Sequence, residues 1–479
     1  MKEIRVYHTH IEISPYKKGE NEKIERLVSL WNPNRYEWNE IGMVIEDEIL
    51  YIPRGISINI LEKEFNTKAK LITTCDDYKR LKTIPILKNK PRGVIQTDSI
   101  DFLNGEGKFK YTRPYSQLSL NLQPGDGKTY CCVSSIMFHR MKAIIITHAD
   151  KIKKQWITTC MDMFTFDEDS LIDIKGSNVI WDIMKGQVKG DIYFVNHQTL
   201  QSFARSHGYT ALRNFFKIIE VGIKVYDEAH LEFKNIVRVD MFSDTMFTYY
   251  LTATFKRSDP TEDRMFSRFF SSVCKFGEET IDYEEKRKHI VYFAVLYNSH
   301  CPDYVAYSMK NRYGFDSKKY IEYALKTDEN RTLIKKIIEI LNKVKNVEGK
   351  VLILSPKIDS SNYIAQELSK YYDKSISTIH SKNTAQYNDA ARDSDIICST
   401  IQSCGVGVDI HGLRILINTE PFASNVTSNQ MSGRLREYSP DLDTYLFDMV
   451  DVSIPRVYEM YKQRLRFFKK RCKEIVLYE

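Results

Sequence analysis

Short apolar runs alternate with helical patterns through the middle of the chain. The run Ala143–Thr147 is rich in β-branched residues, and apolar residues recur at helical spacing after it. The segments 191–204 and 221–233 repeat the same scheme. Strands that are apolar on both faces and separated by helices indicate a parallel sheet covered on both sides. The pattern therefore predicts an α/β fold.

Polar residues stand where each of these strands ends. Thr147 and His148 follow the first strand, Asn196 and Gln198 the second, and the pair Asp227–Glu228 the third. Ligands of open parallel sheets bind at the carboxyl ends of the strands. We therefore expect a binding site at this edge of the sheet.

The stretch LQPGDGKTY, residues 122–130, is a glycine-containing loop between a strand and a helix. Alternating leucines precede it, and a helical pattern follows it. A surface turn is the alternative, and the strict P-loop pattern has glycine where this chain has Leu122. In a P-loop, backbone N–H groups and a lysine hold phosphates, and a hydroxyl binds Mg²⁺. The corresponding residues are Gly125, Asp126, Gly127, Lys128 and Thr129, with Thr129 on the metal.

Two acids follow the buried strand that ends at Tyr226. A solvated turn is one reading of Asp227 and Glu228. Phosphoryl transfer, however, needs one carboxylate to position Mg²⁺ and a second to orient and deprotonate the attacking water. Asp227 suits the first role and Glu228 the second. Together with the loop upstream, the pair predicts a nucleotide hydrolase.

The composition is that of a globular protein without a membrane segment. The 479 residues allow roughly three domains. No window approaches the roughly 20 apolar residues of a membrane span, so we expect an intracellular protein. The nine cysteines form no CxxC pair, which favours reduced core thiols over metal ligands. A net charge of +7 permits a polyanionic partner without requiring one.

Further motifs resemble those of superfamily 2 helicases and translocases. DEAH at 227–230 and LTAT at 251–254 are similar to motifs II and III, and segments 351–359, 397–410 and 429–437 are similar to motifs IV, V and VI. With the P-loop, the six motifs occur in the family's order between about residues 90 and 450. The phrases LTATFKRSD and EILYIPRGISINILEKEF make the chain most similar to phage UvsW-type and XPB-like helicases.

The resemblance implies two tandem RecA-like lobes with parallel sheets and ATP between them. Residues 89–285 would form lobe 1, with the P-loop and DEAH, and residues 286–479 would form lobe 2, with motifs IV to VI. Residues 1–88 would form a small α+β accessory domain that engages duplex or branched DNA.

The resemblance also implies a set of nucleotide-binding residues. Arg92 and Gln96 match the Arg-x-x-x-Gln pattern that recognises adenine. Arg113–Gln117 competes for this role, but it abuts the next strand and leaves no room for a helix. In lobe 2, Gly407 and Asp409 would approach the phosphate and the ribose.

Motif VI departs from the family's Gln-x-x-Gly-Arg-x-x-Arg pattern. Gln430, Gly433 and Arg434 fit, but Glu437 stands where the last arginine is expected, and Arg436 lies one residue early. On a helix, that offset rotates a side chain by about 100°. Arg434 is therefore the preferred contact with the nucleotide, and the choice of arginine finger between Arg434 and Arg436 stays open.

Small polar residues at strand ends match the motifs that hold nucleic-acid backbone in this family. Such groups grip phosphates without reading sequence. A solvated loop is nearly as good an interpretation for His380. The nucleic-acid-binding candidates are Thr147, Asn196, Gln198, Thr199, His380 and Thr400, and Thr252 and Thr254 would couple them to the ATP site.

The two ends of the chain carry weaker signals. Trp31, Tyr36 and Trp38 could stack bases, but we favour a place in the core of a small domain. In the C-terminal stretch 454–476, one helical stripe is apolar and would dock on lobe 2.

The sequence thus predicts an ATP-dependent DNA helicase or translocase that uses ATP and Mg²⁺. An RNA helicase of the same superfamily is one alternative, and a nucleotide-gated nucleic-acid-binding scaffold with weak ATPase activity is another. We expect a cytoplasmic monomer without a membrane partner, in the cytoplasm of a bacterial host if a phage encodes it.

Overall fold

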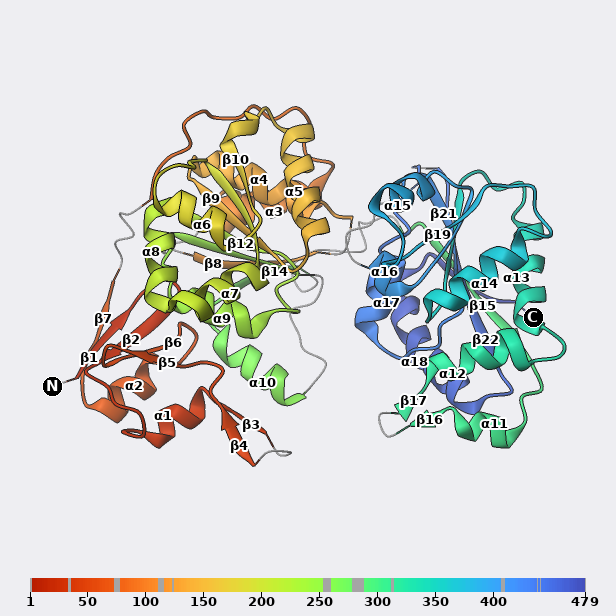
Figure 1. The fold of residues 1–479 in the computed structure, drawn as a ribbon, viewed down its shortest axis with the longest axis horizontal. Helices are drawn as coiled ribbons and strands as arrows, with labels where there is room; N and C mark the ends of the chain where they lie inside the picture. Colours follow the sequence, from red (N-terminus) through yellow and green to blue (C-terminus); the bar gives the residue numbers. More distant parts are fainter. Residues whose placement is uncertain are drawn as a thin grey trace. The chain divides into compact units, whose positions relative to one another are not determined.

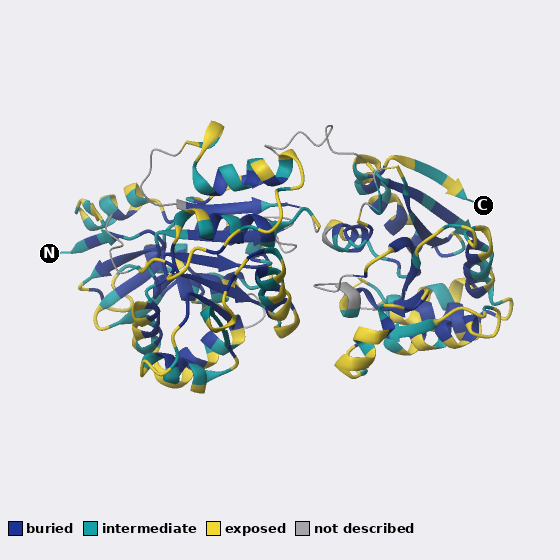
Figure 2. Ribbon diagram, turned by 90° about the horizontal axis from the view of Figure 1, so that it is seen from above, coloured by how far each residue is buried: buried dark blue, intermediate teal, exposed yellow. Residues whose placement is uncertain are grey.

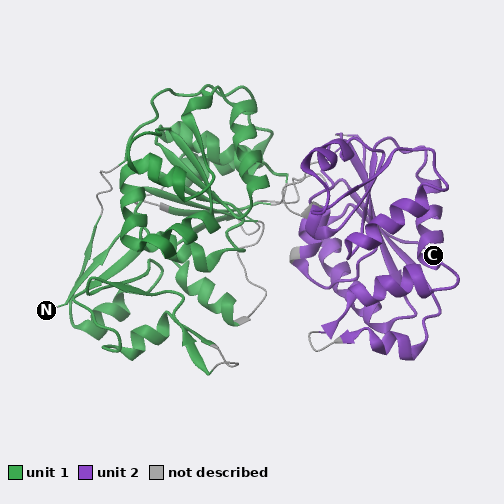
Figure 3. Cartoon of the chain, viewed as in Figure 1, with its two compact units in different colours: residues 1–282 green, residues 283–479 purple. Residues whose placement is uncertain are grey.

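The structure is a computed structural model that divides into two compact units, residues 1–282 and 283–479 (Figure 3). The residues that the structure describes are 2–32, 36–72, 78–110, 116–122, 125–252, 260–277, 288–311, 314–405, 410–436, 438–439 and 441–478.

The larger sheet of unit 1 has seven parallel strands in the order β10-β11-β9-β12-β13-β8-β14 (Figure 1). All five residues of β9 are buried, as its apolar sequence predicts. The strands are β8 (Ser116–Asn121), β9 (Ala143–Thr147), β10 (Leu171–Ile174), β11 (Ile192–Asn196), β12 (Ile223–Tyr226), β13 (Phe247–Thr252) and β14 (Cys274–Gly277).

Helices cover both faces of this sheet because the chain reverses direction across it. From β8 the chain crosses to β9 and on to β10 through α4 and α5, and it then returns toward β13 through α6 to α9. Right-handed crossovers place helices of opposite travel on opposite faces. The helices are α3 (Val94–Asn104), α4 (Lys128–His139), α5 (Asp150–Met163), α6 (Ser177–Met184), α7 (His197–His207), α8 (Tyr209–Ile219), α9 (Phe233–Met241) and α10 (Pro260–Phe269).

A separate five-stranded sheet, in the order β5-β6-β2-β1-β7, forms the N-terminal part of unit 1. Only the pair of β1 and β7 is parallel. The elements are β1 (Glu3–Val6), β2 (His10–Ser14), α1 (Glu22–Leu27), β3 (Leu30–Asn32), β4 (Glu37–Asn39), β5 (Val44–Glu46), β6 (Ile49–Pro53), α2 (Ile58–Phe65) and β7 (Ala69–Leu71).

The N-terminal sheet packs directly on lobe 1. A Cβ atom at Gly55 would lie 2.2 Å from the carbonyl oxygen of Phe269, so the two backbones meet closely there. The guanidinium of Arg213 lies 4.8 Å from the ring centre of Tyr51, and both parts share one hydrophobic core. A separate domain of residues 1–88 stays a prediction, since these residues belong to the same compact unit as lobe 1.

The N-terminal aromatic residues do not lie in the core, so that prediction is wrong. The exposed fractions are 41% for Trp31, 83% for Tyr36 and 45% for Trp38. Trp31 and Trp38 face each other across the β3–β4 hairpin, with ring centres 5.3 Å apart. The hairpin forms a two-stranded sheet of its own, and its rings pack on one another, while the core nearby is filled mostly by aliphatic side chains together with Tyr16 and Tyr51.

Unit 2 also has a sheet of seven parallel strands, in the order β19-β20-β18-β21-β22-β15-β23. Its core strands are buried, as are those of lobe 1 (Figure 2). The strands are β15 (Ile290–Tyr297), β18 (Lys350–Leu354), β19 (Ile376–Ile379), β20 (Ile396–Ser399), β21 (Leu413–Asn418), β22 (Thr444–Asp451) and β23 (Glu474–Tyr478). A short hairpin, β16 (Lys310–Asn311) and β17 (Gly314–Phe315), lies outside this sheet.

The helices of unit 2 end with the long α18. Its residues Val457, Tyr461 and Phe468 are buried, which agrees with the predicted apolar stripe, and Arg464 is fully buried among them. The helices are α11 (Asp303–Ser308), α12 (Ser317–Glu322), α13 (Thr332–Lys343), α14 (Ile358–Leu368), α15 (Ala385–Ala391), α16 (Ile401–Gly405), α17 (Asn425–Ser432) and α18 (Pro455–Arg471).

The predicted fold class is confirmed: two α/β units with parallel sheets, plus a small α+β part at the N-terminus. Among the described residues, no helix has both the length and the apolar character needed to cross a membrane.

Candidate active site

The predicted P-loop joins the end of β8 to the start of α4. Gly125 and Gly127 have φ values of 93° and 87°, in the left-handed region that glycine adopts without strain. The first hydrogen bond of α4 runs from the N–H of Cys131 to the carbonyl of Gly127, 3.0 Å, so the amides before Cys131 face out of the helix end. Nζ of Lys128 donates to the carbonyl of Leu122 across the loop, at 2.9 Å. This arrangement is suited to an anion.

The side chain of Gln96 lies against this loop. Its Nε2 donates to the carbonyl of Asp126 at 3.0 Å, and its Oε1 accepts from the N–H of Arg92 at 2.7 Å. A Cβ atom at Gly127 would lie 2.3 Å from Nε2 of Gln96, so only glycine leaves room for this contact. The structure therefore brings Arg92 and Gln96 to the P-loop.

The competing candidate has a different environment. Gln117 lies within β8, is 8% exposed, and donates from Nε2 to the hydroxyl of Tyr250 at 3.0 Å. Its Oε1 accepts from the hydroxyl of Ser272 at 2.6 Å. Gln117 is thus engaged within the sheet, and Arg113 lies outside the described residues.

Asp227 follows β12 and is held by two donors. Its Oδ2 accepts from the indole N–H of Trp156 at 2.8 Å, and its Oδ1 accepts from the N–H of Glu228 at 3.0 Å. Burial raises the pKa of Asp227, and the neighbouring charge of Glu228 adds to this effect. The Trp156 hydrogen bond and the charge of Lys128 act in the opposite direction. A cation placed beside this carboxylate would therefore favour its ionised form.

Glu228, His230 and Thr252 form a connected group beside Asp227. Nδ1 of His230 lies 2.9 Å from Oγ1 of Thr252 and 3.4 Å from Oε2 of Glu228. Glu228 has a φ of 48°, a left-handed conformation that is uncommon for a residue with a side chain and that clusters at functional sites. The end of β13 thus contacts the DEAH segment. Thr254 lies outside the described residues.

The ends of β9 and β11 are joined by a chain of hydrogen bonds. The hydroxyl of Thr147 donates to Oδ1 of Asn196 at 2.8 Å, and Nδ2 of Asn196 donates to Oδ1 of Asp150 at 2.6 Å. Thr147 is fully buried, so it positions Asn196. Gln198 is exposed and Thr199 partly exposed at the start of α7, where they are accessible to a ligand.

In unit 2, the two nucleic-acid candidates are engaged within the protein. Oγ1 of Thr400 accepts from the N–H of Ser403 at 3.0 Å and so caps α16. Nε2 of His380 lies 3.1 Å from Oδ1 of Asn362, and burial lowers the pKa of His380. The exposed fractions are 7% for Thr400 and 5% for His380, so only a small part of each residue is accessible.

The motif VI helix, α17, ends at Ser432, before either arginine. The N–H of Arg434 bonds to the carbonyl of Met431 at 3.1 Å, and the N–H of Arg436 bonds to the carbonyl of Arg434 at 3.0 Å. Helical geometry therefore does not apply to the offset of Arg436. Arg434 is partly buried and Arg436 is exposed, while Gln430 is partly buried on the last turn of α17. Gly407, Asp409 and Glu437 lie outside the described residues.

Sequence reasoning missed Trp156 and the side-chain role of His230. Trp156 is 1% exposed although it stands in the polar segment DKIKKQW. A tryptophan inside such a segment is a signal of burial, but nothing in its spacing points to Asp227.

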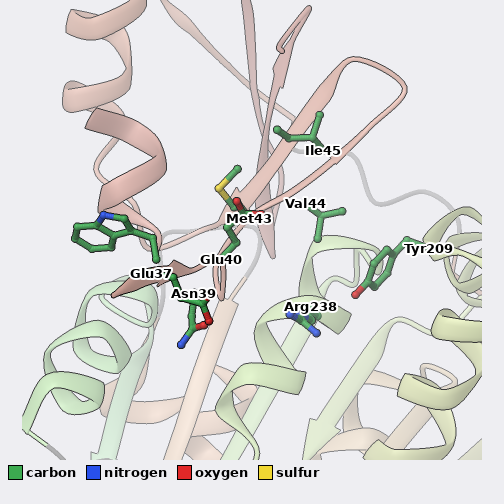
Figure 4. Close-up of a pocket in the computed structure, with 9 residues that line it drawn as sticks. Glu37, Asn39, Glu40, Met43, Val44, Ile45, Tyr209 and Arg238 are labelled. Atoms are coloured by element: carbon green, nitrogen blue, oxygen red, sulfur yellow. The ribbon is translucent and has the colours of Figure 1, made fainter. Parts of the chain in front are cut away.

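A hollow of about 480 Å³ opens between the N-terminal part and lobe 1 (Figure 4). None of the predicted site residues lines it. The lining residues are Glu37, Trp38, Asn39, Glu40, Met43, Val44, Ile45, Tyr209 and Arg238.

Comparison with known proteins agrees with this architecture. Residues 99–257 match the family described as type III restriction enzyme, res subunit. Comparison with curated proteins found no match.

Several solved structures are similar. S. cerevisiae Dbp5 bound to RNA and ADP BeF3 aligns with a TM-score of 0.54 and 15% identity over 80% of this chain and 88% of that chain. A fragment described as an HsdR subunit of a type I restriction enzyme from Vibrio vulnificus YJ016 has a TM-score of 0.54 and 12% identity over 82% and 69% of the two chains. T4 UvsW aligns over 99% of both chains at 14% identity, but its TM-score of 0.37 is too low to show a shared fold.

The similarities to solved structures show the fold of the chain. The chain therefore has the tandem RecA-like fold found in superfamily 2 helicases, and residues 99–257 of its first lobe resemble the res subunit of type III restriction enzymes.

Proposed function

We propose that the chain is an ATP-dependent DNA helicase or translocase that acts on replication, recombination or repair intermediates. One observation carries the proposal: a glycine-shaped loop with Lys128, the Asp227–Glu228 pair and the Thr252–His230 contact all lie at the carboxyl ends of strands of one sheet. A phosphate site, an acid pair and a connection to a neighbouring strand are the parts that a nucleic-acid-driven ATPase needs.

The first step is nucleotide binding. Arg92 and Gln96 would hold the adenine beside the loop, and the amides at the start of α4 would hold the phosphates with Gly125, Asp126, Gly127 and Lys128. Thr129 and Asp227 would hold Mg²⁺, which neutralises phosphate charge when bound. From lobe 2, Gly407 and Asp409 would reach the phosphate and the ribose.

Hydrolysis would then depend on Glu228 as the general base. Its carboxylate would orient the attacking water and take its proton. His230, which contacts Thr252 at the end of β13, lies 3.4 Å from that carboxylate and would help to position it. Gln430 and Arg434 of motif VI would stabilise the charge that develops on the transferred phosphoryl group, with Arg436 as the alternative. Partial burial favours Arg434 for this role, because a partly desolvated cation acts more strongly than an exposed one.

Nucleic acid would lie along the exposed polar residues at the strand ends. In lobe 1, Asn196, Gln198 and Thr199 offer amide and hydroxyl groups, with Thr147 behind Asn196. In lobe 2, the small accessible parts of Thr400 and His380 would make the corresponding contacts. Such contacts hold phosphates without reading bases, as a motor that steps along a strand requires. Thr252 and Thr254 would link this track to hydrolysis.

ATPase assays with different nucleic acids test the proposal. Turnover is expected to rise with single-stranded, duplex or branched DNA, and Lys128→Ala serves as the inactive control. The match to a restriction-enzyme family favours DNA, whereas the similarity to RNA-bound Dbp5 makes RNA the competing substrate. Stimulation by RNA alone would establish the RNA helicase. Turnover that no nucleic acid changes would overturn the motor in favour of a nucleotide-gated scaffold.

A further inference from the structure

Helix α5 contacts two parts of the proposed machinery. At its first residue, Asp150 accepts from Nδ2 of Asn196 at 2.6 Å, beside the nucleic-acid track. Within the helix, Trp156 donates from Nε1 to Oδ2 of Asp227 at 2.8 Å. The two contact points are six residues apart, or about 9 Å along a helix. A single rigid element therefore joins the track to the carboxylate of the metal site.

The middle of α5 is fixed to the sheet. Lys153 is 2% exposed, lies 2.6 Å from Oδ1 of Asp173 and donates to the carbonyl of Ile174 at 3.1 Å. Its Nζ also lies 3.2 Å from Oδ1 of Asp150. These contacts hold α5 to β10 at Lys153, which lies between the two functional positions, so a change at one of them reaches the other as a tilt of the helix about this point.

The hydrogen bond from Trp156 constrains Asp227 in a specific way. An indole N–H only donates, so it contacts a carboxylate oxygen and cannot accept from any donor that would compete. Since Oδ1 is held by the N–H of Glu228, both oxygens of Asp227 have a fixed donor, and the plane of the carboxylate is set. Groups that fix a metal ligand in this way tune metal binding strongly.

We propose that Trp156 is a positioning residue that couples capture of nucleic acid at Asn196 and Asp150 to the orientation of Asp227. This inference rests on the proposed function. When a phosphate engages Asn196, the hydrogen bond to Asp150 changes, α5 responds as a rigid rod, and Trp156 sets the carboxylate for the magnesium-bound nucleotide. Nucleic acid thereby assists hydrolysis from within lobe 1.

The substitution Trp156→Phe tests the inference, because it removes the N–H and keeps an aromatic ring. Two measurements are needed: the affinity for a fluorescent ADP analogue with Mg²⁺ and with EDTA, and the kcat and KM for ATP with saturating DNA. We expect the affinity gained from Mg²⁺ to fall roughly 10- to 100-fold, the usual effect of removing a partner of a metal ligand. DNA-stimulated kcat should fall similarly, with the affinity in EDTA unchanged.

Trp181→Phe is the matched control. Trp181 lies on α6 of the same lobe and packs edge-on against Phe203, with ring centres 5.5 Å apart. Both measurements should match the unmodified protein. If Trp156→Phe behaves like Trp181→Phe, the inference is overturned.

Asp150→Ala tests the other end of α5 and covers the case in which Trp156→Phe does not fold. Asp150 has an exposed side chain, and without it Lys153 keeps its contacts with Asp173 and with the carbonyl of Ile174, so α5 stays packed on β10. We expect stimulation by DNA to fall while the Mg²⁺-dependent affinity for ADP is kept. Full stimulation in Asp150→Ala would overturn the coupling. Absence of stimulation in the unmodified protein overturns the motor itself, and with it the coupling, whereas the Mg²⁺ measurement still decides the role of Trp156 at Asp227.

Discussion

The hydroxyl of Thr252 lies 2.9 Å from Nδ1 of His230, and the same nitrogen lies 3.4 Å from Oε2 of Glu228. Thr252, the last residue of β13, is therefore connected through His230 to Glu228, the proposed general base. Thr252→Val keeps the shape of the side chain and removes the hydroxyl. We expect ATP binding to be kept and DNA-stimulated kcat to fall roughly 10-fold or more, since a buried polar partner that is lost costs about 1–3 kcal/mol.

Thr252→Ser is the control for that prediction. It restores the hydroxyl without the methyl group and should recover most of the turnover. Equal turnover in the Val and Ser variants would show that the hydroxyl has no part in coupling.

Substitutions of Glu228 and Lys128 should separate nucleotide binding from hydrolysis. Glu228→Gln keeps the size of the side chain and removes the base, so turnover should fall roughly 10²–10⁴-fold while ATP still binds. Lys128→Ala removes the cation that reaches across the P-loop, so nucleotide affinity itself should fall. Titration with a fluorescent nucleotide and steady-state ATPase assays measure the two effects. An equal loss of affinity in both variants would contradict the role given to Glu228.

Motif VI offers two arginines for one task. Arg434→Ala should lower DNA-stimulated turnover roughly 10³–10⁵-fold, the usual contribution of an arginine finger, with ATP binding largely kept. Arg436→Ala is the matched variant, and its effect should be small because Arg436 is exposed whereas Arg434 is partly buried. A loss as large for Arg436 as for Arg434 would show that both face the nucleotide.

Much of the architecture could be predicted from the sequence because parallel strands leave a strong pattern. The apolar run of β9 and the polar residues at the ends of β11 and β12 predicted the parallel sheet and the edge at which we propose the site. The start of α4 could also be predicted, because the glycine at Gly127 and the helical pattern after Lys128 mark where the helix begins.

Other features could not be predicted because they depend on contacts distant in sequence. Trp31 and Trp38 are large apolar residues of a type that often lies in a core. They nevertheless pack on each other in a hairpin outside the main sheets. The hydrogen bond of Trp156 to Asp227 spans 71 positions of the chain. The end of α17 before Arg434 was also not predictable, since a single glycine at its end does not decide whether a helix continues.

His197 should make stability depend on pH below neutrality. It is 2% exposed and stacked on Tyr226, with ring centres 5.6 Å apart, and burial, aided by the charge of His148, lowers its pKa to about 3. The unfolded chain binds this proton at pH below about 6.5, but the folded chain does not. The stability that neutral His197 provides is therefore complete above about pH 6.5 and lost as the pH falls toward the folded pKa.

His197→Phe removes this titration and keeps a ring against Tyr226. The free energy of unfolding can be measured by urea denaturation at several pH values between 7 and the lowest pH at which the protein stays folded. As the pH falls, it should decrease less steeply in the variant, by up to about 1.4 kcal/mol per pH unit. His207→Gln removes an exposed imidazole from the same helix and is the control. An unchanged slope in His197→Phe would show that His197 does not contribute to the acid sensitivity.

The buried ion pair of Arg464 and Asp448 should be critical for unit 2. Arg464 is 0% exposed, its Nε lies 2.9 Å from Oδ2 of Asp448, and its Nη1 donates to the carbonyl of Phe422 on the loop that leads to α17. Arg464→Met leaves the carboxylate buried without its cation, which typically costs about 3–5 kcal/mol. Urea denaturation midpoints would measure this loss.

The matched control for Arg464 lies on the same helix. Arg456 pairs with Glu459 at 2.8 Å on the surface, so Arg456→Met should cost less than about 1 kcal/mol. Replacing both buried partners, Arg464→Met with Asp448→Leu, should recover part of the stability, because no uncompensated charge is left inside. The recovery should be incomplete, since Tyr292 and Asn418 also donate to Asp448 and would lose their acceptor. If Arg464→Met is as mild as Arg456→Met, the pair does not stabilise unit 2.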